Sequence, residues 1–139
     1  NHAVNNKKIL VFGGDQKRPN INIKDMARVY VKVLESEKSK IAGEIFNAGY
    51  ENYTIKKLAE IVRKKIDEKI NIDFQPTNDQ RSYHISSEKI KEKLDFQNHH
   101  DIEEAVESLK TAFSNKQLQD SLNNPLYFNI QRMKQINLK

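Results

Sequence analysis

The 139-residue sequence contains no cysteine and no long run of apolar residues. The first absence excludes disulfide bonds and thiolate chemistry, although it leaves the redox compartment undetermined. The second absence excludes a membrane-spanning helix of the usual length, and no secretory signal pattern is visible. These absences predict a soluble, cytoplasmic protein without a membrane partner.

Apolar residues are also scarce in the composition as a whole. Only 37% of the residues are hydrophobic, and the mean hydropathy is −0.82. A compact fold of this length, about one domain, buries roughly two-thirds of the surface of its unfolded chain. The sequence is poor in apolar residues for such a fold. We therefore expect either a piece cut from a larger core or a chain that covers surface with a partner.

The charge is positive but dispersed. The formal net charge is +5, yet the 24 basic residues are interleaved with 19 acidic ones, and no basic run is long. Scattered lysines of this kind are typical of a solvated surface rather than of a stripe that follows nucleic-acid phosphates. We expect no nucleic-acid partner, and a basic nucleic-acid-binding module remains the alternative to be tested.

A glycine-containing turn near the amino terminus is the most informative segment of the sequence. Gly13 and Gly14 follow an apolar stretch, as in a dinucleotide-binding unit. Counting on from Gly13, however, the later glycine positions of that fingerprint hold Gln16 and Pro19, and Pro19 restricts Arg18 to extended conformations. We therefore reject a cofactor site here. The segment is interpreted as a turn that presents cations to an anion, with a solvated hairpin as the structural alternative.

Hydrophobic periodicity and capping residues predict short strands alternating with helices. The strands are predicted at residues 9–12, 20–24, 44–48, 71–75 and 82–85. The helices are predicted to begin at Asp25, at Thr54, at Ser86 or Ser87, and at Asp101, which forms a capping box with Glu104. This alternation predicts an α/β fold. The short strands would leave open edges, so we expect homo-oligomers through pairing between copies.

Five segments in order resemble one family. They are GGDQKRPNINIKDMA at 13–27, GEIFNAG at 43–49, TIKKLAEIV at 54–62, DQRSYHI at 79–85 and KIKEKLDF at 89–96. Together they resemble the extended short-chain dehydrogenase/reductase enzymes, that is, the NAD-dependent sugar-nucleotide epimerase/dehydratase family. The combination is far more specific than any single match.

The resemblance implies a particular part of such an enzyme. The sequence begins at Asn1 and lacks the family's glycine fingerprint. Residues 1–139 are therefore expected to be the carboxy-terminal, substrate-binding part, with 116–139 as a tail that carries none of the motifs. NAD would be bound by the absent amino-terminal Rossmann domain, and no cofactor by this chain. The implied ligand is a nucleotide-diphosphate sugar.

The resemblance also assigns roles to six residues. Arginines at the positions of Arg18 and Arg81 hold the pyrophosphate, which guanidinium groups bind through two parallel hydrogen bonds. Phe12 would stack on the base, Leu10 and Val11 would supply backbone contacts, and Gln16 would hydrogen-bond the nucleotide. The structural alternatives are ion pairing for the arginines, core packing for Phe12 and a turn role for Gln16.

Two further patterns are rejected, one as a catalytic site and the other as a metal site. Tyr53 and Lys57 have the family's Tyr-x-x-x-Lys spacing, but they straddle a helix start downstream of the substrate segment. We therefore expect no catalytic residue in this chain. The four histidines show no metal-ligand spacing, so we also expect no metal site. The isolated chain is expected to be inactive. A non-catalytic structural remnant is the second alternative.

Overall fold

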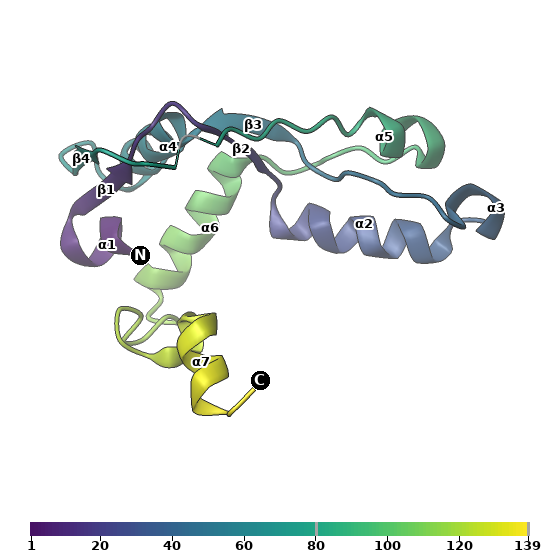
Figure 1. Cartoon of the computed structure of the whole chain (residues 1–139). Coiled ribbons are helices and arrows are strands. Elements are labelled where there is room, and N and C mark those ends of the chain that lie inside the picture. Colours follow the sequence, from purple (N-terminus) through teal and green to yellow (C-terminus); the bar gives the residue numbers. More distant parts are fainter. Residues whose placement is uncertain (80, 139) are drawn as a thin grey trace.

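The computed structural model describes residues 1–79 and 81–138, and helices alternate with short strands along them (Figure 1). The α/β prediction is confirmed. Two small sheets carry the strands. In the first, β1 (Lys8–Phe12) pairs in parallel with β4 (Asn71–Gln75). In the second, β2 (Lys17–Asn20) pairs antiparallel with β3 (Glu51–Thr54). The turn between β1 and β2 therefore joins the two sheets.

One group of helices packs around the β1/β4 sheet. It consists of α1 (His2–Asn6), α4 (Ile55–Ile66) and α6 (Ile102–Ser114), with α4 contacting each of the others and β1. Thr54 caps α4 as predicted, because its hydroxyl accepts a hydrogen bond from Lys57 N. The capping box of Asp101 and Glu104 at the start of α6 is also confirmed. The buried apolar residues of this region are Ala3, Val11, Ala59, Ile61, Ile70 and Val106.

A second core lies at the other end of the molecule. There α2 (Ile23–Glu35), α3 (Lys38–Ile41) and α5 (Glu88–Leu94) surround the extended segment 44–48 (Figure 1). Its buried members are Val29, Ile90, Leu94 and Phe96, and Ile21, Val33, Ile41, Phe46 and Ala48 pack against them. The carboxy-terminal elements η1 (Pro125–Tyr127) and α7 (Asn129–Gln135) contact each other, and Leu126 and Ile130 are each 66% exposed.

The start of α2 differs from the prediction. A strand was predicted over residues 20–24, but β2 ends at Asn20 and the helix begins at Ile23. The side chain of Asn22 accepts a hydrogen bond from Lys24 N, so Asn22 is the N-cap. Asn is as good a cap as Asp, and it comes first in the chain. Asp25 is left inside the first turn, where it is buried.

Two predicted strands are extended without belonging to a sheet. Residues 44–48 and 82–85 carry no strand pairing in the described chain. The second segment is held mainly by side chains. Lys17 N donates to Ser82 Oγ at 2.9 Å, and the Asn52 amide exchanges two hydrogen bonds with the backbone of Ile85. These contacts replace most of a backbone ladder, so the prediction of strands at 44–48 and 82–85 was wrong.

Candidate anion site

The turn after β1 is closed by its own glutamine. Gly13 and Gly14 have φ values of 74° and 138°, which favour glycine. Gln16 Oε1 accepts a hydrogen bond from Gly14 N at 2.6 Å, and Gln16 Nε2 donates to Phe12 O at 2.8 Å. Both ends of the Gln16 amide are therefore engaged within the turn. This is the turn role that the sequence left open as its alternative.

Arg18 projects from β2 toward the segment that carries Arg81. Its Nη1 donates to Arg81 O at 2.6 Å and to Lys17 O at 2.9 Å. The guanidinium carbon lies 5.2 Å from the ring centre of Tyr83, close enough for a cation–π contact. These contacts leave the Arg18 side chain 28% exposed. The group is oriented by its surroundings but still reaches solvent.

Arg81 lies beside Arg18, and one carboxylate connects the two. Arg81 Nε and Nη2 donate to the two Asp79 carboxylate oxygens at 2.7 and 2.8 Å, and Arg18 Nη2 lies 4.0 Å from Asp79 Oδ2. The Arg81 hydrogen bond holds the pKa of Asp79 well below its usual range, with the Arg18 charge as a smaller cause. The same contact raises the pKa of Arg81. Both arginines thus reach one anionic group.

A cavity of about 570 Å³ lies beside the glycine turn. It is lined by Gly13, Asp15, Gln16, Pro76, Thr77, Asp79 and Ser82. Asp79 belongs both to the cavity wall and to the ion pair with Arg81. Asp79 therefore connects the cavity wall with the arginine pair, and the Arg81 side chain itself is 71% exposed to solvent.

Phe12 and Val11 occupy opposite environments on β1. Phe12 is at the carboxyl end of the strand, and 56% of it is exposed. Val11 is only 2% exposed and lies in register with Phe74 of β4. An exposed ring next to the cavity turn is available to a flat ligand. The Val11 side chain belongs to the core, so only its backbone is left for the predicted contact.

Tyr53 and Lys57 lie in different elements, and Tyr53 is hydrogen-bonded to a carboxylate. Tyr53 lies in β3 and Lys57 in α4, with Thr54 between them as the cap. The Tyr53 hydroxyl donates to Glu51 Oε1 at 2.5 Å. This hydrogen bond, with burial and the nearby negative charges adding to it, raises the pKa of Tyr53 to about 12. A general-base tyrosine needs the opposite shift, because its phenolate must form near neutral pH.

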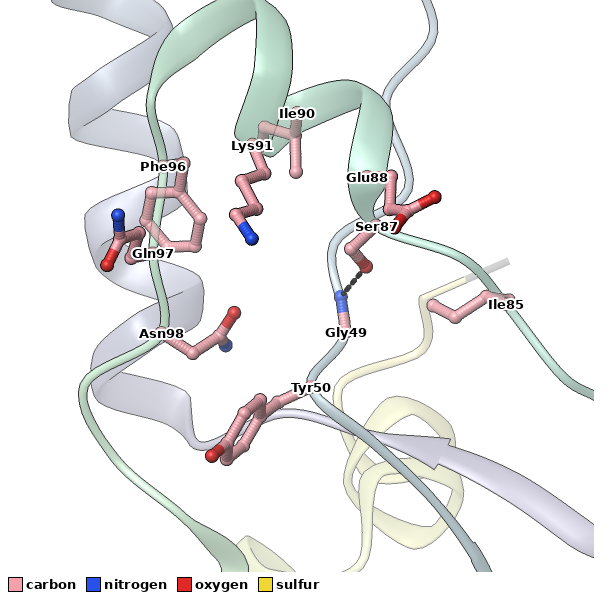
Figure 2. A pocket seen from close by; sticks show the side chains of 10 residues that line it. All are labelled: Gly49, Tyr50, Ile85, Ser87, Glu88, Ile90, Lys91, Phe96, Gln97 and Asn98. Atoms are coloured by element: carbon pink, nitrogen blue, oxygen red, sulfur yellow. Dashed lines mark hydrogen bonds between the residues drawn. The ribbon is translucent and has the colours of Figure 1, made fainter.

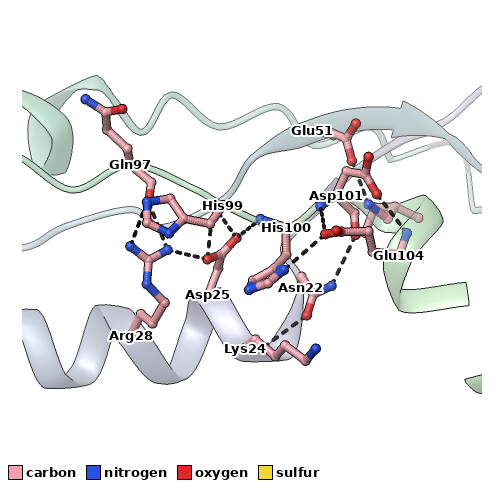
Figure 3. Close-up of polar contacts among 11 residues, drawn as sticks. Asn22, Lys24, Asp25, Arg28, Glu51, Gln97, His99, His100, Asp101 and Glu104 are labelled. Atoms are coloured by element: carbon pink, nitrogen blue, oxygen red, sulfur yellow. Dashed lines mark hydrogen bonds and ion pairs between the residues drawn. The ribbon is translucent and has the colours of Figure 1, made fainter. Parts of the chain in front are cut away.

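Sequence reasoning missed a polar network around Asp25 (Figure 3). Asp25 is 0% exposed, and its carboxylate accepts hydrogen bonds from His99 N at 3.0 Å, His100 N at 2.8 Å and Arg28 Nη1 at 2.6 Å. Burial alone would raise the pKa of Asp25, but these hydrogen bonds outweigh burial and lower it. The network fixes α2 to the segment before α6. The only sequence signal was the i, i+3 spacing of Asp25 and Arg28.

A second cavity of about 370 Å³ lies between α5, residues 96–98 and Gly49 (Figure 2). Ser87 does not cap α5; its hydroxyl instead accepts a hydrogen bond from Gly49 N at 2.9 Å on the cavity wall. Asn98 Nδ2 is buried and has no hydrogen-bond partner among the described residues. No predicted site residue lines this cavity, so it is separate from the arginine pair.

Within residues 1–79 and 81–138, no cluster of three or more His, Cys, Asp or Glu side chains has the geometry to hold a metal ion. No helix in the same residues combines the length and apolar character needed to cross a bilayer.

Comparison with known proteins supports the resemblance found in the motifs. Residues 1–49 match the model of the NAD dependent epimerase/dehydratase family. No curated protein matches the sequence. Among solved structures, L-threonine dehydrogenase from Phytophthora infestans is similar with a TM-score of 0.72 and 15% identity, covering 83% of this chain and 39% of that one.

Two further structures show the same partial coverage. L-threonine dehydrogenase from Clostridium difficile has a TM-score of 0.68 at 16% identity over 83% of this chain and 38% of its own. The UDP-Glc/GlcNAc 4-epimerase from Campylobacter jejuni has a TM-score of 0.57 at 17% identity over 79% and 36%. The chain thus spans about two-fifths of the length of these structures. The predicted resemblance to the NAD-dependent epimerase/dehydratase family is confirmed by the match of residues 1–49, and the described chain has the fold of part of these solved structures.

Proposed function

We propose that this chain is the nucleotide-sugar-binding part of an NAD-dependent epimerase or dehydratase. The observation that carries the proposal is the convergence of Arg18 and Arg81 on the Asp79 carboxylate. The two arginines come from segments 63 positions apart in the sequence. A diphosphate offers acceptor oxygens to both guanidinium groups at once. Asp79 therefore stands where phosphate oxygens of the ligand would bind.

The ligand would be fixed at two points. The diphosphate would replace Asp79 at the arginines, and the exposed ring of Phe12 would stack on the base beside the glycine turn. The role of the chain is then positioning, since holding a sugar in one orientation lowers the entropic cost of a later step. No residue of this chain is assigned to proton or hydride transfer.

The chain's own residues do not fit a bound NAD. The glycine turn is followed by strand β2, not by a helix whose N-terminus could receive a pyrophosphate. Gly13 is also closely surrounded, because a Cβ at this position would lie 2.7 Å from Gln16 and Thr77 atoms. On this proposal, the nicotinamide chemistry of the family belongs to a part of the fold beyond these residues. The isolated chain should therefore show no NAD-dependent turnover.

A second candidate comes from the solved structures. Several similar folds are L-threonine dehydrogenases, whose substrate is a small amino acid. An amino acid has one carboxylate and would need only one guanidinium group. The paired arginines favour the diphosphate, and L-threonine is the informative competitor in a binding experiment.

Calorimetric titration tests the proposal. The chain is titrated with UDP-, dTDP-, GDP- and CDP-sugars, with L-threonine, and with a single-stranded oligonucleotide at two salt concentrations. We expect saturable binding of one nucleotide-sugar class only. Loss of Arg18 or Arg81 to alanine should weaken that binding by about 1.5–3 kcal/mol, the contribution of a charged hydrogen bond.

The other outcomes point to the alternatives. Oligonucleotide binding with a steep salt dependence and no sugar preference would favour a basic nucleic-acid module. Binding of L-threonine alone would favour an amino-acid dehydrogenase. A structural remnant predicts that both alanine variants leave every measured affinity unchanged.

A further inference from the structure

The ring of Tyr83 reaches Arg18 from a neighbouring extended segment. Tyr83 N donates a hydrogen bond to Lys17 O at 3.1 Å, which fixes the backbone of this segment against β2. Two residues further on, Asn52 Nδ2 donates to Ile85 O at 3.1 Å, and Ile85 N donates to Asn52 Oδ1 at 3.0 Å. The backbone around Tyr83 is therefore held by hydrogen bonds that do not use the Tyr83 side chain.

Two kinds of contact hold the Arg18 guanidinium group. Its Nη1 donates to the carbonyl oxygens of Lys17 and Arg81 at 2.9 and 2.6 Å, but both hydrogen bonds are exposed, so water competes with them. The guanidinium carbon also lies over the Tyr83 ring, 5.2 Å from the ring centre. The ring limits the conformations that the long Arg18 side chain can adopt. It thereby keeps Nη2 on the side of Asp79, 4.0 Å from Oδ2.

We propose that Tyr83 is a positioning residue for the arginine pair, and that its ring holds the Arg18 guanidinium group beside Arg81 before the ligand arrives. The inference rests on the proposed diphosphate site. Ordering a long side chain costs conformational entropy, and a side chain that is already ordered does not lose that entropy on binding. Tyr83 thus strengthens diphosphate binding through Arg18.

This role belongs to the aromatic ring of Tyr83 and not to its hydroxyl group. A cation–π contact uses the negative face of an aromatic ring, which phenylalanine also has and leucine lacks. The Tyr83 side chain is 46% exposed, so the segment does not depend on its burial. Tyr83→Phe should therefore keep the positioning role, and Tyr83→Leu should lose it while the fold is retained.

A measurement on the ligand-free chain tests the contact itself. The proton resonances of the Arg18 side chain are recorded by NMR in the native chain, Tyr83→Phe and Tyr83→Leu. We expect an upfield ring-current shift in the native chain and in Tyr83→Phe, and its loss in Tyr83→Leu. Circular dichroism should be the same for all three chains. Arg18 resonances that do not differ among the three chains would overturn the inference.

A binding measurement tests the consequence of the contact. The probe is the nucleoside diphosphate of the nucleotide-sugar class that binds in the titration. Tyr83→Leu should raise its dissociation constant by about fivefold, the equivalent of one cation–π contact. Tyr83→Phe should stay within about twofold of the native chain, because it keeps the ring. The matched control is Tyr30→Leu on α2, where 67% of the residue is exposed and the affinity should be unchanged.

The outcomes separate this inference from the proposed function. If Arg18→Ala and Arg81→Ala weaken binding while Tyr83→Leu binds as the native chain does, only the role of Tyr83 is overturned. A loss of affinity in Tyr83→Phe as large as that in Tyr83→Leu would also overturn it, because the hydroxyl group would then be responsible. If no nucleoside diphosphate binds, or if neither arginine variant changes the affinity, the proposed function fails and the positioning role fails with it.

Discussion

At the scale of single residues, the carboxylate of Asp25 has a different role from the one predicted. It was predicted to cap α2, a task that Asn22 performs instead. Asp25 is fully buried and accepts hydrogen bonds from the backbone of His99 and His100. Local patterns reveal caps, but contacts between residues more than 70 positions apart depend on the tertiary fold. The network around Asp25 therefore could not be predicted from local patterns in the sequence.

Asp25→Asn should destabilise the protein by about 2–4 kcal/mol at pH 7, because the backbone donors and Arg28 lose a buried anion. Urea unfolding measures the change. The control is Asp73→Asn, which removes a surface pair with Lys8 and should cost less than about 1 kcal/mol. Equal losses in the two variants would mean that the Asp25 network contributes no more than a surface ion pair.

The pH dependence of this contribution has a definite sign. The folded-state pKa of Asp25 is lowered from 3.8, so the stabilisation is present above that value and is lost as the pH falls through the folded-state pKa. The difference between the native chain and Asp25→Asn should therefore be full at neutral pH and shrink below pH 3.8. A difference that stays constant into that acid range would contradict the network.

Tyr53 gives a spectroscopic prediction. Its hydrogen bond to Glu51 raises the pKa of Tyr53 to about 12. Ultraviolet titration should show one tyrosine ionising about two pH units above an ordinary one, and Glu51→Gln should return it toward about 10. The control is Tyr30→Phe, which removes an exposed phenol and should leave the high-pKa transition in place. A Tyr53 pKa near neutrality would revive the catalytic reading of Tyr53 and Lys57.

At the scale of elements, helices were predicted better than strands. The caps Thr54 and Asp101 act locally, so they can be recognised in the sequence. Strands need partners. Residues 44–48 alternate inward and outward side chains as a strand does, but the described chain supplies no neighbour for their backbone. The β3 strand was missed because its four residues are all half-buried and show no alternation.

The end of α5 offers a simple stability test. Asp95, the C-cap of α5, adopts a left-handed conformation with φ 49°. Asp95→Gly should stabilise the protein by up to about 1 kcal/mol, because glycine adopts this conformation without a steric cost. Thermal unfolding measures the gain. The comparison is Asp120→Gly, also left-handed at φ 47°, where we expect a smaller gain because the substitution removes the hydrogen bond that Asn123 Nδ2 donates to Asp120 Oδ1 at 2.9 Å. A loss of stability in Asp95→Gly would show that the Asp95 side chain contributes more than its backbone strain costs.

At the scale of the whole molecule, the low apolar content and the structure agree. The sequence has few apolar residues for a complete core, and the folded chain has two separate small cores and an uncovered face on α2. The α/β class and the meeting of Arg18 with Arg81 were predicted, the second through the motifs. The ion pairing of Asp79 with both arginines was not predicted, because a carboxylate two positions from an arginine can equally well point to solvent.

The most direct measurement of the central claim is the dissociation constant of the native chain and of Arg81→Lys for the nucleoside diphosphate of the nucleotide-sugar class that binds in the titration. Lysine keeps the charge but cannot form two parallel hydrogen bonds. If Arg81 binds a diphosphate, the affinity should fall by about tenfold, the equivalent of one charged hydrogen bond. Arg63→Lys on α4 is the matched control and should bind the same nucleoside diphosphate as tightly as the native chain does. An unchanged affinity in Arg81→Lys would contradict the assignment of the arginine pair as the diphosphate site.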